Sequence, residues 1–307
     1  MRESADGKVE LWWSTGVRWH QGRPALGWYH EQHGDRLGAD VLGAELSFVA
    51  GAQRRCLGVR RSRGRLPCPS GALLAPAGTR AQCAPCSALD RSQSVAADTV
   101  PDDPQPYHLY LAYFRAGLVK VGISAVERGT ARLLEQGAIA HLLLGRGPLM
   151  AARRAEAVLG AALGLPDHVR AEAKRPAREG LPPVAERLAE LTALGARCHA
   201  LPGWPEALHR LPGEPPADNC AAYGLGPAGA PTIDERVVSF AEGGEVAGIV
   251  RAVVGPDVYL DSDRGSRLLL DSRHLAGWAL RKDPSARTAV PVVKAVHPSA
   301  AEQPQLF

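Results

Sequence analysis

The chain has 307 residues, of which 45% are hydrophobic and 22% charged, so it can form about two folded domains and is not disordered throughout. Its net charge is only +4, although Lys and Arg together number 36 and all but five of them are Arg. The first residues lack the order of a secretion signal, and no stretch approaches the ~20 apolar residues of a membrane helix. We therefore expect a cytoplasmic protein with no membrane partner.

The N-terminal part, residues 1–91, is predicted to be a β-module followed by a Cys-rich segment. From position 9 to about 50, apolar and polar residues alternate with frequent glycines, which is typical of short strands. The stretch from 54 to 90 has few apolar runs and many Cys and Arg residues. Residues 92–106 are polar and rich in Pro and Asp, and we interpret them as a linker.

Four of the six cysteines lie in the Cys-rich segment, at Cys56, Cys68, Cys83 and Cys86. Cys83 and Cys86 form a C-x-x-C pair, which lets one tight turn present two thiolates to a tetrahedral zinc ion. The spacing of Cys56 and Cys68 is not that of a zinc knuckle, so four unrelated thiols remain the alternative. A thioredoxin-like redox pair is disfavoured because no βαβ pattern surrounds it. We expect a structural Zn²⁺ site in a zinc-ribbon-like segment.

The same segment carries a cluster of arginines that is predicted to contact nucleic acid. A basic patch beside a zinc site is the electrostatic footprint of a protein that binds phosphate backbones. A solvated basic loop is the alternative. The residues concerned are Arg54, Arg55, Arg60, Arg61, Arg63 and Arg65.

Residues 106–200 have the most regular pattern and predict a ββαβα unit. Ser124 precedes Glu127 by three positions, the signature of a capping box at a helix start, and Gly137 would end that helix. The expected strands are 107–114, 118–123 and 139–144, and the expected later helices are 149–163 and 184–194. A Gly- and Pro-rich linker, 202–231, and a small antiparallel β-module, 232–300, complete the chain. Cys198 and Cys220 stand alone and are interpreted as incidental.

Polar residues of the central unit form a candidate catalytic site. Glu156 could hold a divalent ion such as Mg²⁺ or Mn²⁺ through oxygen, and Arg132 could stabilise charge on a phosphorane. Tyr110 or Lys120 could act on the nucleophile. Arg128, one turn before Arg132, faces the same side of the helix and is a further candidate for nucleic-acid contact. The alternative is a salt bridge between Arg132 and Glu156, with Tyr110 in the core.

This pattern resembles the GIY-YIG nuclease superfamily. The segment His108-Leu-Tyr110 is followed after nine residues by Lys120-Val-Gly122, then by a helix with an arginine and a later helix with a glutamate. The resemblance implies a metal-dependent nuclease site. The matching positions are Tyr110, Gly122, Arg132 and Glu156, whereas His108 replaces the glycine of the first motif and Lys120 the tyrosine of the second.

A wider resemblance covers most of the chain. The run from Lys120-Val-Gly122 to Arg132-Leu-Leu-Glu-Gln-Gly137, after a Cys-rich stretch and before a β-rich tail, is similar to an uncharacterised bacterial family, domain of unknown function 2797. That resemblance implies an architecture and no particular activity.

We therefore predict an α+β protein with an N-terminal β and zinc-ribbon part, a central GIY-YIG-like unit and a C-terminal antiparallel β-module. The leading functional hypothesis is metal-dependent phosphodiester cleavage of nucleic acid. The first alternative is a non-catalytic, zinc-containing nucleic-acid-binding protein. The second is a structural or interaction protein in which the arginine cluster is only surface.

Overall fold

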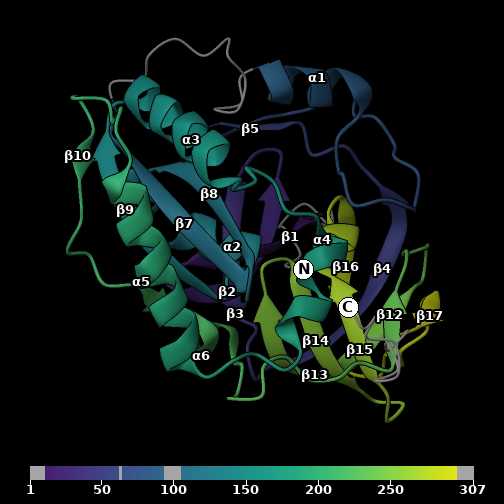
Figure 1. Cartoon of the computed structure of the whole chain (residues 1–307). Coiled ribbons are helices and arrows are strands. Elements are labelled where there is room, and N and C mark those ends of the chain that lie inside the picture. The colour runs from purple at the N-terminus through teal and green to yellow at the C-terminus, as the bar shows by residue number, and fades with distance from the viewer. Residues whose placement is uncertain (1–10, 62–63, 93–104, 296–307) are drawn as a thin grey trace.

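The computed structural model describes residues 11–61, 64–92 and 105–295. They form a ten-stranded sheet, a five-stranded sheet flanked by helices, and a two-stranded hairpin (Figure 1). The α+β class predicted from the sequence is confirmed.

The large sheet contains strands from both ends of the chain. Its order is β17-β12-β15-β14-β13-β4-β16-β1-β2-β3, with β4 paired to both β13 and β16. The N-terminal and C-terminal modules that the sequence suggests as separate units are therefore one continuous sheet. The strands are β1 Trp13–His20, β2 Arg23–His30, β3 Gly34–Asp40, β4 Glu45–Arg54, β12 Glu235–Val237, β13 Glu245–Val254, β14 Asp257–Ser262, β15 Arg267–Asp271, β16 Trp278–Lys282 and β17 Val292–Lys294.

The smaller sheet has the order β10-β9-β7-β8, with β11 also paired to β9. Its strands are β7 Tyr107–Arg115, β8 Leu118–Ala125, β9 Ala140–Gly147, β10 His209–Arg210 and β11 Ala217–Asp218. The helices are α2 Ala131–Gln136, α3 Leu149–Leu163, α4 Ala171–Lys174, α5 Val184–Ala200 and α6 Cys220–Tyr223, and the 3-10 turns are η1 Val126–Arg128, η2 Pro176–Arg178 and η3 Ser272–Leu275. The predicted ββαβα order of elements is thus observed.

Helices or loops cover both faces of the smaller sheet, which explains the continuous apolar run of β7. Leu109, Leu111 and Tyr113 belong to the large core that also contains residues of α3 and α5. Tyr110 and Phe114 point to the opposite face, where they pack in a cluster with residues of α2 and with Val169. A strand buried on both faces loses the alternation of apolar and polar residues.

The capping-box prediction is wrong. Ser124 lies within β8, where it pairs with His108, because the β7–β8 ladder continues to Ala125. The helix begins only at Ala131, after the turn η1, and Thr130 at its start makes no side-chain cap. Gly137 does end it, with a left-handed φ of 72°.

The stretch 202–231, expected to be a linker, contributes β10, β11 and α6. Tyr223 of α6 is fully buried and contacts Trp19 of β1 edge-on, with ring centroids 5.2 Å apart. This contact joins the two sheets. The linker expected at 92–106 falls almost entirely outside the described residues.

The Cys-rich segment forms a hairpin and a helix. The hairpin is β5 Val59–Arg61 with β6 Gly64–Leu66, and the helix is α1 Ala84–Ser92. A zinc-ribbon arrangement is therefore not confirmed, because one half of the cysteine set comes from a helix. The segment docks on the large sheet, where Leu57 and Ala81 pack with Tyr29.

Candidate functional site

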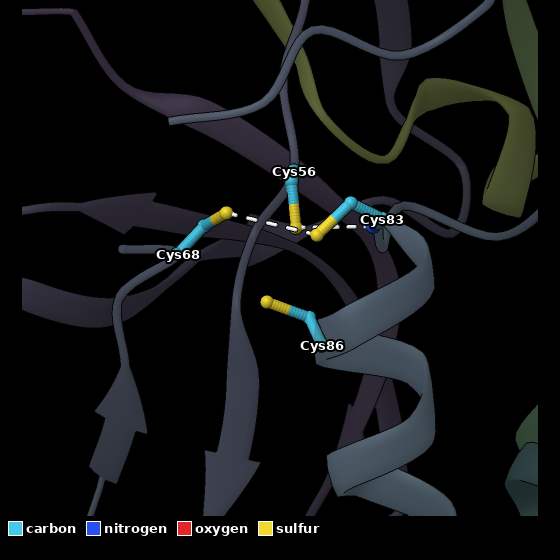
Figure 2. A group of neighbouring side chains, drawn as sticks. All are labelled: Cys56, Cys68, Cys83 and Cys86. Atoms are coloured by element: carbon cyan, nitrogen blue, oxygen red, sulfur yellow. Dashed lines mark hydrogen bonds between the residues drawn. The ribbon is translucent and has the colours of Figure 1, made fainter. Parts of the chain in front are cut away.

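The four cysteines of the Cys-rich segment converge on one point (Figure 2). Cys56 follows β4, Cys68 follows β6, Cys83 directly precedes α1 and Cys86 lies in its first turn. Their sulfur atoms all lie within 4.8 Å of one another, and those of Cys68 and Cys83 are 3.8 Å apart. A tetrahedral zinc ion with Zn–S bonds of ~2.3 Å needs S–S distances of about 3.8 Å. The cluster has the size of such a site.

Backbone groups around the cluster favour thiolates. The amides of Cys83 and Gly58 donate to the Sγ of Cys56, at 3.2 and 3.4 Å. Cys83 and Cys86 also sit at the N-terminal end of α1, where the helix dipole stabilises negative charge. Such hydrogen bonds to ligand sulfurs are the usual supporting contacts of a metal site.

The thiols differ in their electrostatic surroundings. A hydrogen bond with the hydroxyl of Ser70 is the main cause that lowers the pKa of Cys68 to about 6. Burial raises the pKa of Cys56 and, together with the neighbouring thiols, that of Cys86. A cation is needed to hold the whole set as thiolates.

The four cysteines could therefore hold a metal ion such as zinc. They are the one group of three or more His, Cys, Asp or Glu side chains with chelating geometry in residues 11–61, 64–92 and 105–295. Glu156 belongs to no such group. The resemblance to GIY-YIG nucleases implied a site for Mg²⁺ or Mn²⁺, and nothing in the described residues supports one.

A cleft of ≈ 1040 Å³ lies beside the cysteine cluster. One side is formed by the cysteine wall, which we define as residues 56–61 and 64–92, and the other by the sheet wall, residues 107–174. The floor includes β1 and the turns at 255–257 and 272–276 of the large sheet. Ten Lys and Arg side chains line the cleft against five Asp and Glu, so it is strongly basic.

The crowding of cations alters their ionisation. Burial, followed by the charges of Lys120, Arg178 and Arg132, lowers the pKa of Lys174 to about 7. Burial and the charge of Arg132 likewise lower the pKa of Lys120. Both amines donate to backbone carbonyls, Lys120 to that of Asp167 at 2.8 Å and Lys174 to that of Gln136 at 2.9 Å. Neither amine is ion-paired with a described carboxylate.

The predicted catalytic residues are divided between the cleft and the protein interior. Lys120 and Arg132 line the cleft. Glu156, half-buried on α3, does not line it, but its charge acts on Lys120. Burial raises the pKa of Glu156, and Lys120 lowers it in part. Arg132 and Glu156 form no salt bridge within the described part of the chain, so that alternative is not observed.

Tyr110 lies beneath the cleft with only 2% of its surface exposed. Its hydroxyl accepts a hydrogen bond from Nε2 of Gln136 at 2.9 Å. Its ring covers Gly122 on the neighbouring strand, where a Cβ atom would come within 2.6 Å of the ring. Gly122 is therefore required by the packing of Tyr110, and the tyrosine is part of the core as well as a neighbour of Lys120.

The arginine cluster does not form one basic patch. Arg54 is buried, and its guanidinium donates to the carbonyls of Ala276, Ala75, Ala77 and Arg80 at 2.9–3.4 Å. It fastens the cysteine wall to the large sheet and is not placed to contact a phosphate. Local clustering in the sequence could not reveal this role, because three of the carbonyls lie at 75–80 and one at 276.

The other predicted arginines occupy different environments. Arg55 lies over the ring of Trp13 at 5.7 Å, and Arg61 is near Asp90 at 3.9 Å. Arg65 pairs with Asp35 at 3.0 Å, and both Arg65 and the exposed Arg60 line the cleft. Arg63 lies outside the described residues, and Arg128 is ion-paired with Glu135. Six of the cleft cations were not predicted from the sequence, namely Arg18, Arg80, Arg170, Lys174, Arg178 and Arg273.

Among the residues that the structure describes, no helix is long and apolar enough to span a membrane. Comparison with curated proteins gives no match. Comparison with solved structures gives none either. A family model described as "Protein of unknown function (DUF2797)" matches residues 43–280, a range that contains the cysteine cluster and both walls of the cleft. The chain therefore belongs to the DUF2797 family.

Proposed function

We propose that the protein binds the phosphate backbone of a nucleic acid in the basic cleft, with zinc in the cysteine cluster holding the cysteine wall in place. The observation that carries this proposal is that cations from three separated parts of the chain face one cleft without carboxylate partners among the described residues. Arg18 comes from β1, Arg80 from the cysteine wall and Arg132 from α2.

The lack of carboxylate partners among the described residues for several cleft cations supports the proposal that the cleft binds an anionic ligand. Several arginines that stabilise this fold are ion-paired, as Arg178 is with Asp257 at 2.7 Å and Arg187 with Asp218 at 2.6 Å. Arg132, by contrast, forms no ion pair with a described residue, and Lys120 and Lys174 donate to backbone carbonyls. Gathering uncompensated cations costs stability, and an anion bound between them would offset that cost.

The experiment is a titration of a fluorescent single-stranded oligonucleotide at several salt concentrations. For single strands the logarithm of the affinity falls with the logarithm of salt by ~0.7 for each phosphate contact. The double variant Arg132→Gln/Lys174→Gln should therefore bind more weakly and lose roughly 1.4 from the slope.

A matched control removes the same charge outside the cleft. Arg23→Gln/Arg281→Gln replaces two exposed arginines that do not line the cleft. Arg23 lies 3.7 Å from Asp40, and Arg281 lies 2.8 Å from Asp283. The slope of this control should stay close to that of the wild type. Equal slopes for the two double variants would mean that phosphate is bound elsewhere.

A second candidate function is cleavage of the bound backbone. It is favoured by the electrostatic coupling of Lys120 to both Arg132 and Glu156. In this proposal Glu156 holds Mg²⁺ or Mn²⁺, Arg132 neutralises the scissile phosphate, and Lys120 or Tyr110 activates the attacking water.

Cleavage is tested on single- and double-stranded DNA and RNA with Mn²⁺. Glu156→Gln should abolish product, and Arg132→Gln should reduce the rate by ~10²–10³. Glu172→Gln, which removes an exposed carboxylate lining the cleft, serves as the control and should keep the activity. If the wild type binds an oligonucleotide but cleaves none, the cleavage proposal fails and only the binding function remains.

A further inference from the structure

Arg18 lies on the floor of the cleft, and its charge is uncompensated. Its side chain lines the cleft, and its only polar contact with a described residue is a hydrogen bond from Nε to the hydroxyl of Thr15 at 3.4 Å. The two terminal nitrogens have no partner in the described chain. Four of the five N–H groups of a guanidinium are carried by these nitrogens, so most of its donors face the cleft.

The neighbouring strand holds the side chain of Arg18 in position. A Cβ atom at Gly27 would lie 2.8 Å from Cγ of Arg18 and 2.2 Å from Oγ1 of Thr15. The absence of a side chain at Gly27 therefore lets the stem of Arg18 lie flat across β2. This packing places the stem of Arg18 against the strand, and its guanidinium lines the cleft.

The buried arginines of the fold have partners within the protein, whereas the half-buried Arg18 has none in the described chain for its terminal nitrogens. Arg54 donates to four carbonyls, and Arg187 pairs with Asp218 at 2.6 Å. The guanidinium of Arg18 is half-buried at the floor of an open cleft, and without a partner among the described residues its terminal nitrogens are free to bind an anion. The missing partner of Arg18 is therefore expected to be a ligand.

The charges around Arg18 also call for an anion. Burial, followed by the charge of Arg60, lowers its pKa to about 10. The carboxylates that act on it are Glu135 and Asp35, and both are already engaged, Glu135 with Arg128, and Asp35 with Arg65 at 3.0 Å and more distantly with Arg60 at 4.0 Å. Arg18 and Arg60 thus face the same space with no free carboxylate of the described chain between them.

We propose that Arg18 and Arg60 form a subsite for a terminal phosphate, the monoester at the end of a nucleic-acid strand. This inference rests on the proposed function and adds the kind of ligand that the cleft selects. An internal phosphodiester carries a nucleoside on both sides, and both would have to reach the floor of the cleft with it. A terminal phosphate enters end-on, and its second negative charge matches the second arginine.

The experiment compares one single-stranded oligonucleotide with a 5′-phosphate, with a 3′-phosphate and with hydroxyl ends only. The wild type should bind one phosphorylated form about tenfold to a hundredfold more tightly than the hydroxyl form, which is the range of a charge-assisted hydrogen bond. Arg18→Gln should remove that preference, and because it also removes one cleft cation it should weaken the hydroxyl form as well, but by a smaller factor than the phosphorylated form. Arg23→Gln, an exposed arginine of the same sheet, should keep the preference.

Arg60→Gln provides a second variant if Arg18→Gln does not fold, because Arg60 is exposed and its replacement disturbs no core. It should also reduce the preference. A wild type that binds all three oligonucleotides equally, or an Arg18→Gln protein that still prefers the phosphorylated one, overturns the subsite but leaves backbone binding intact. Failure of every oligonucleotide to bind defeats the proposed function itself. A nucleoside monophosphate or inorganic phosphate that competes as well as the phosphorylated strand also overturns the proposal, because the ligand is then a small phosphate.

Discussion

The two walls of the cleft are built in different ways. The sheet wall rests on β7, whose residues from Leu109 to Phe114 are each at most 2% exposed. The cysteine wall has a cluster of only three buried residues, Cys56, Val59 and Cys86, and two of these are candidate metal ligands. One wall is held by its own apolar core, whereas the other has little apolar interior of its own beyond its cysteines and packs Leu57 and Ala81 against the large sheet.

This difference assigns a physical role to the cysteine cluster. A segment of fewer than about 40 residues rarely buries enough surface to be stable without a metal, a disulfide or a partner. The cysteines are all free thiols. We therefore propose that the cysteine wall, with Arg60, Arg65 and Arg80, depends on metal to keep its cations facing those of the sheet wall.

The largest effect is expected when the metal is removed. Cys83→Ser should reduce the zinc content from ~1 per chain to near zero, and residues 56–92 should lose protection from hydrogen exchange, because metal binding in small sites supplies ~10–16 kcal/mol. Residues 107–163 should change little. Protection of residues 56–92 without metal would show that the two walls do not differ. Cys198→Ala, a buried cysteine outside the cluster, should keep the zinc.

The next largest effect is expected at the ion pairs that attach residues 175–178, which follow the sheet wall, to the large sheet. Asp257 is 1% exposed and pairs with Arg175 at 2.6 Å and with Arg178 at 2.7 Å. Asp257→Asn leaves buried guanidinium charge uncompensated and should cost about 3–5 kcal/mol of unfolding free energy. Asp283→Asn, at a solvent-accessible ion pair with Arg281, should cost much less. Denaturant unfolding measures both, and equal costs would contradict the role of the buried pair.

The same aspartate predicts a pH dependence. Burial raises the pKa of Asp257, but Arg178 and Arg175 together lower it further, so the folded value lies below the ordinary value of 3.8. A group whose pKa is lower in the folded state stabilises the protein above its unfolded pKa. That stabilisation is lost as the pH falls through the folded pKa. In Asp257→Asn the acid-side fall in stability, followed by denaturant unfolding at several pH values, should be shallower than in the wild type.

A smaller effect is expected inside the sheet wall. Gly122→Ala places a Cβ atom within 2.6 Å of the Tyr110 ring, so the ring must shift, at a cost of about 1–3 kcal/mol in unfolding free energy. Gly213→Ala introduces the same methyl group in open space and should change the stability by less than ~0.5 kcal/mol. Equal stabilities of the two variants in denaturant unfolding would show that this wall is more loosely packed than we infer.

Local patterns predicted the elements of the sheet wall well. Helix α3 spans Leu149–Leu163, the range that its Ala-rich pattern and Gly164 indicated, because both signals act within one or two turns. The C-x-x-C pair likewise revealed half of the cysteine cluster. The capping box failed because strand pairing with β7 outweighed a local cap.

Long-range pairing was beyond the reach of the sequence. The single ten-stranded sheet depends on β4 meeting β13 and β16, about 200 residues later in the chain. The cleft depends on the same pairing, since it collects cations from Arg18 to Arg273. No sequence pattern around Arg18 indicated that it lines a cleft. A glycine at position 27 within a strand, which often marks a close approach, was the one available hint.

The most direct test of the central claim, that one phosphate-bearing ligand contacts both walls, is hydrogen exchange with and without a bound single-stranded oligonucleotide. We expect protection at the same ligand concentration in 57–65 and 79–90 of the cysteine wall and in 120–136 and 167–174 of the sheet wall. Protection confined to one wall, or found only on surfaces outside the cleft, would contradict the account.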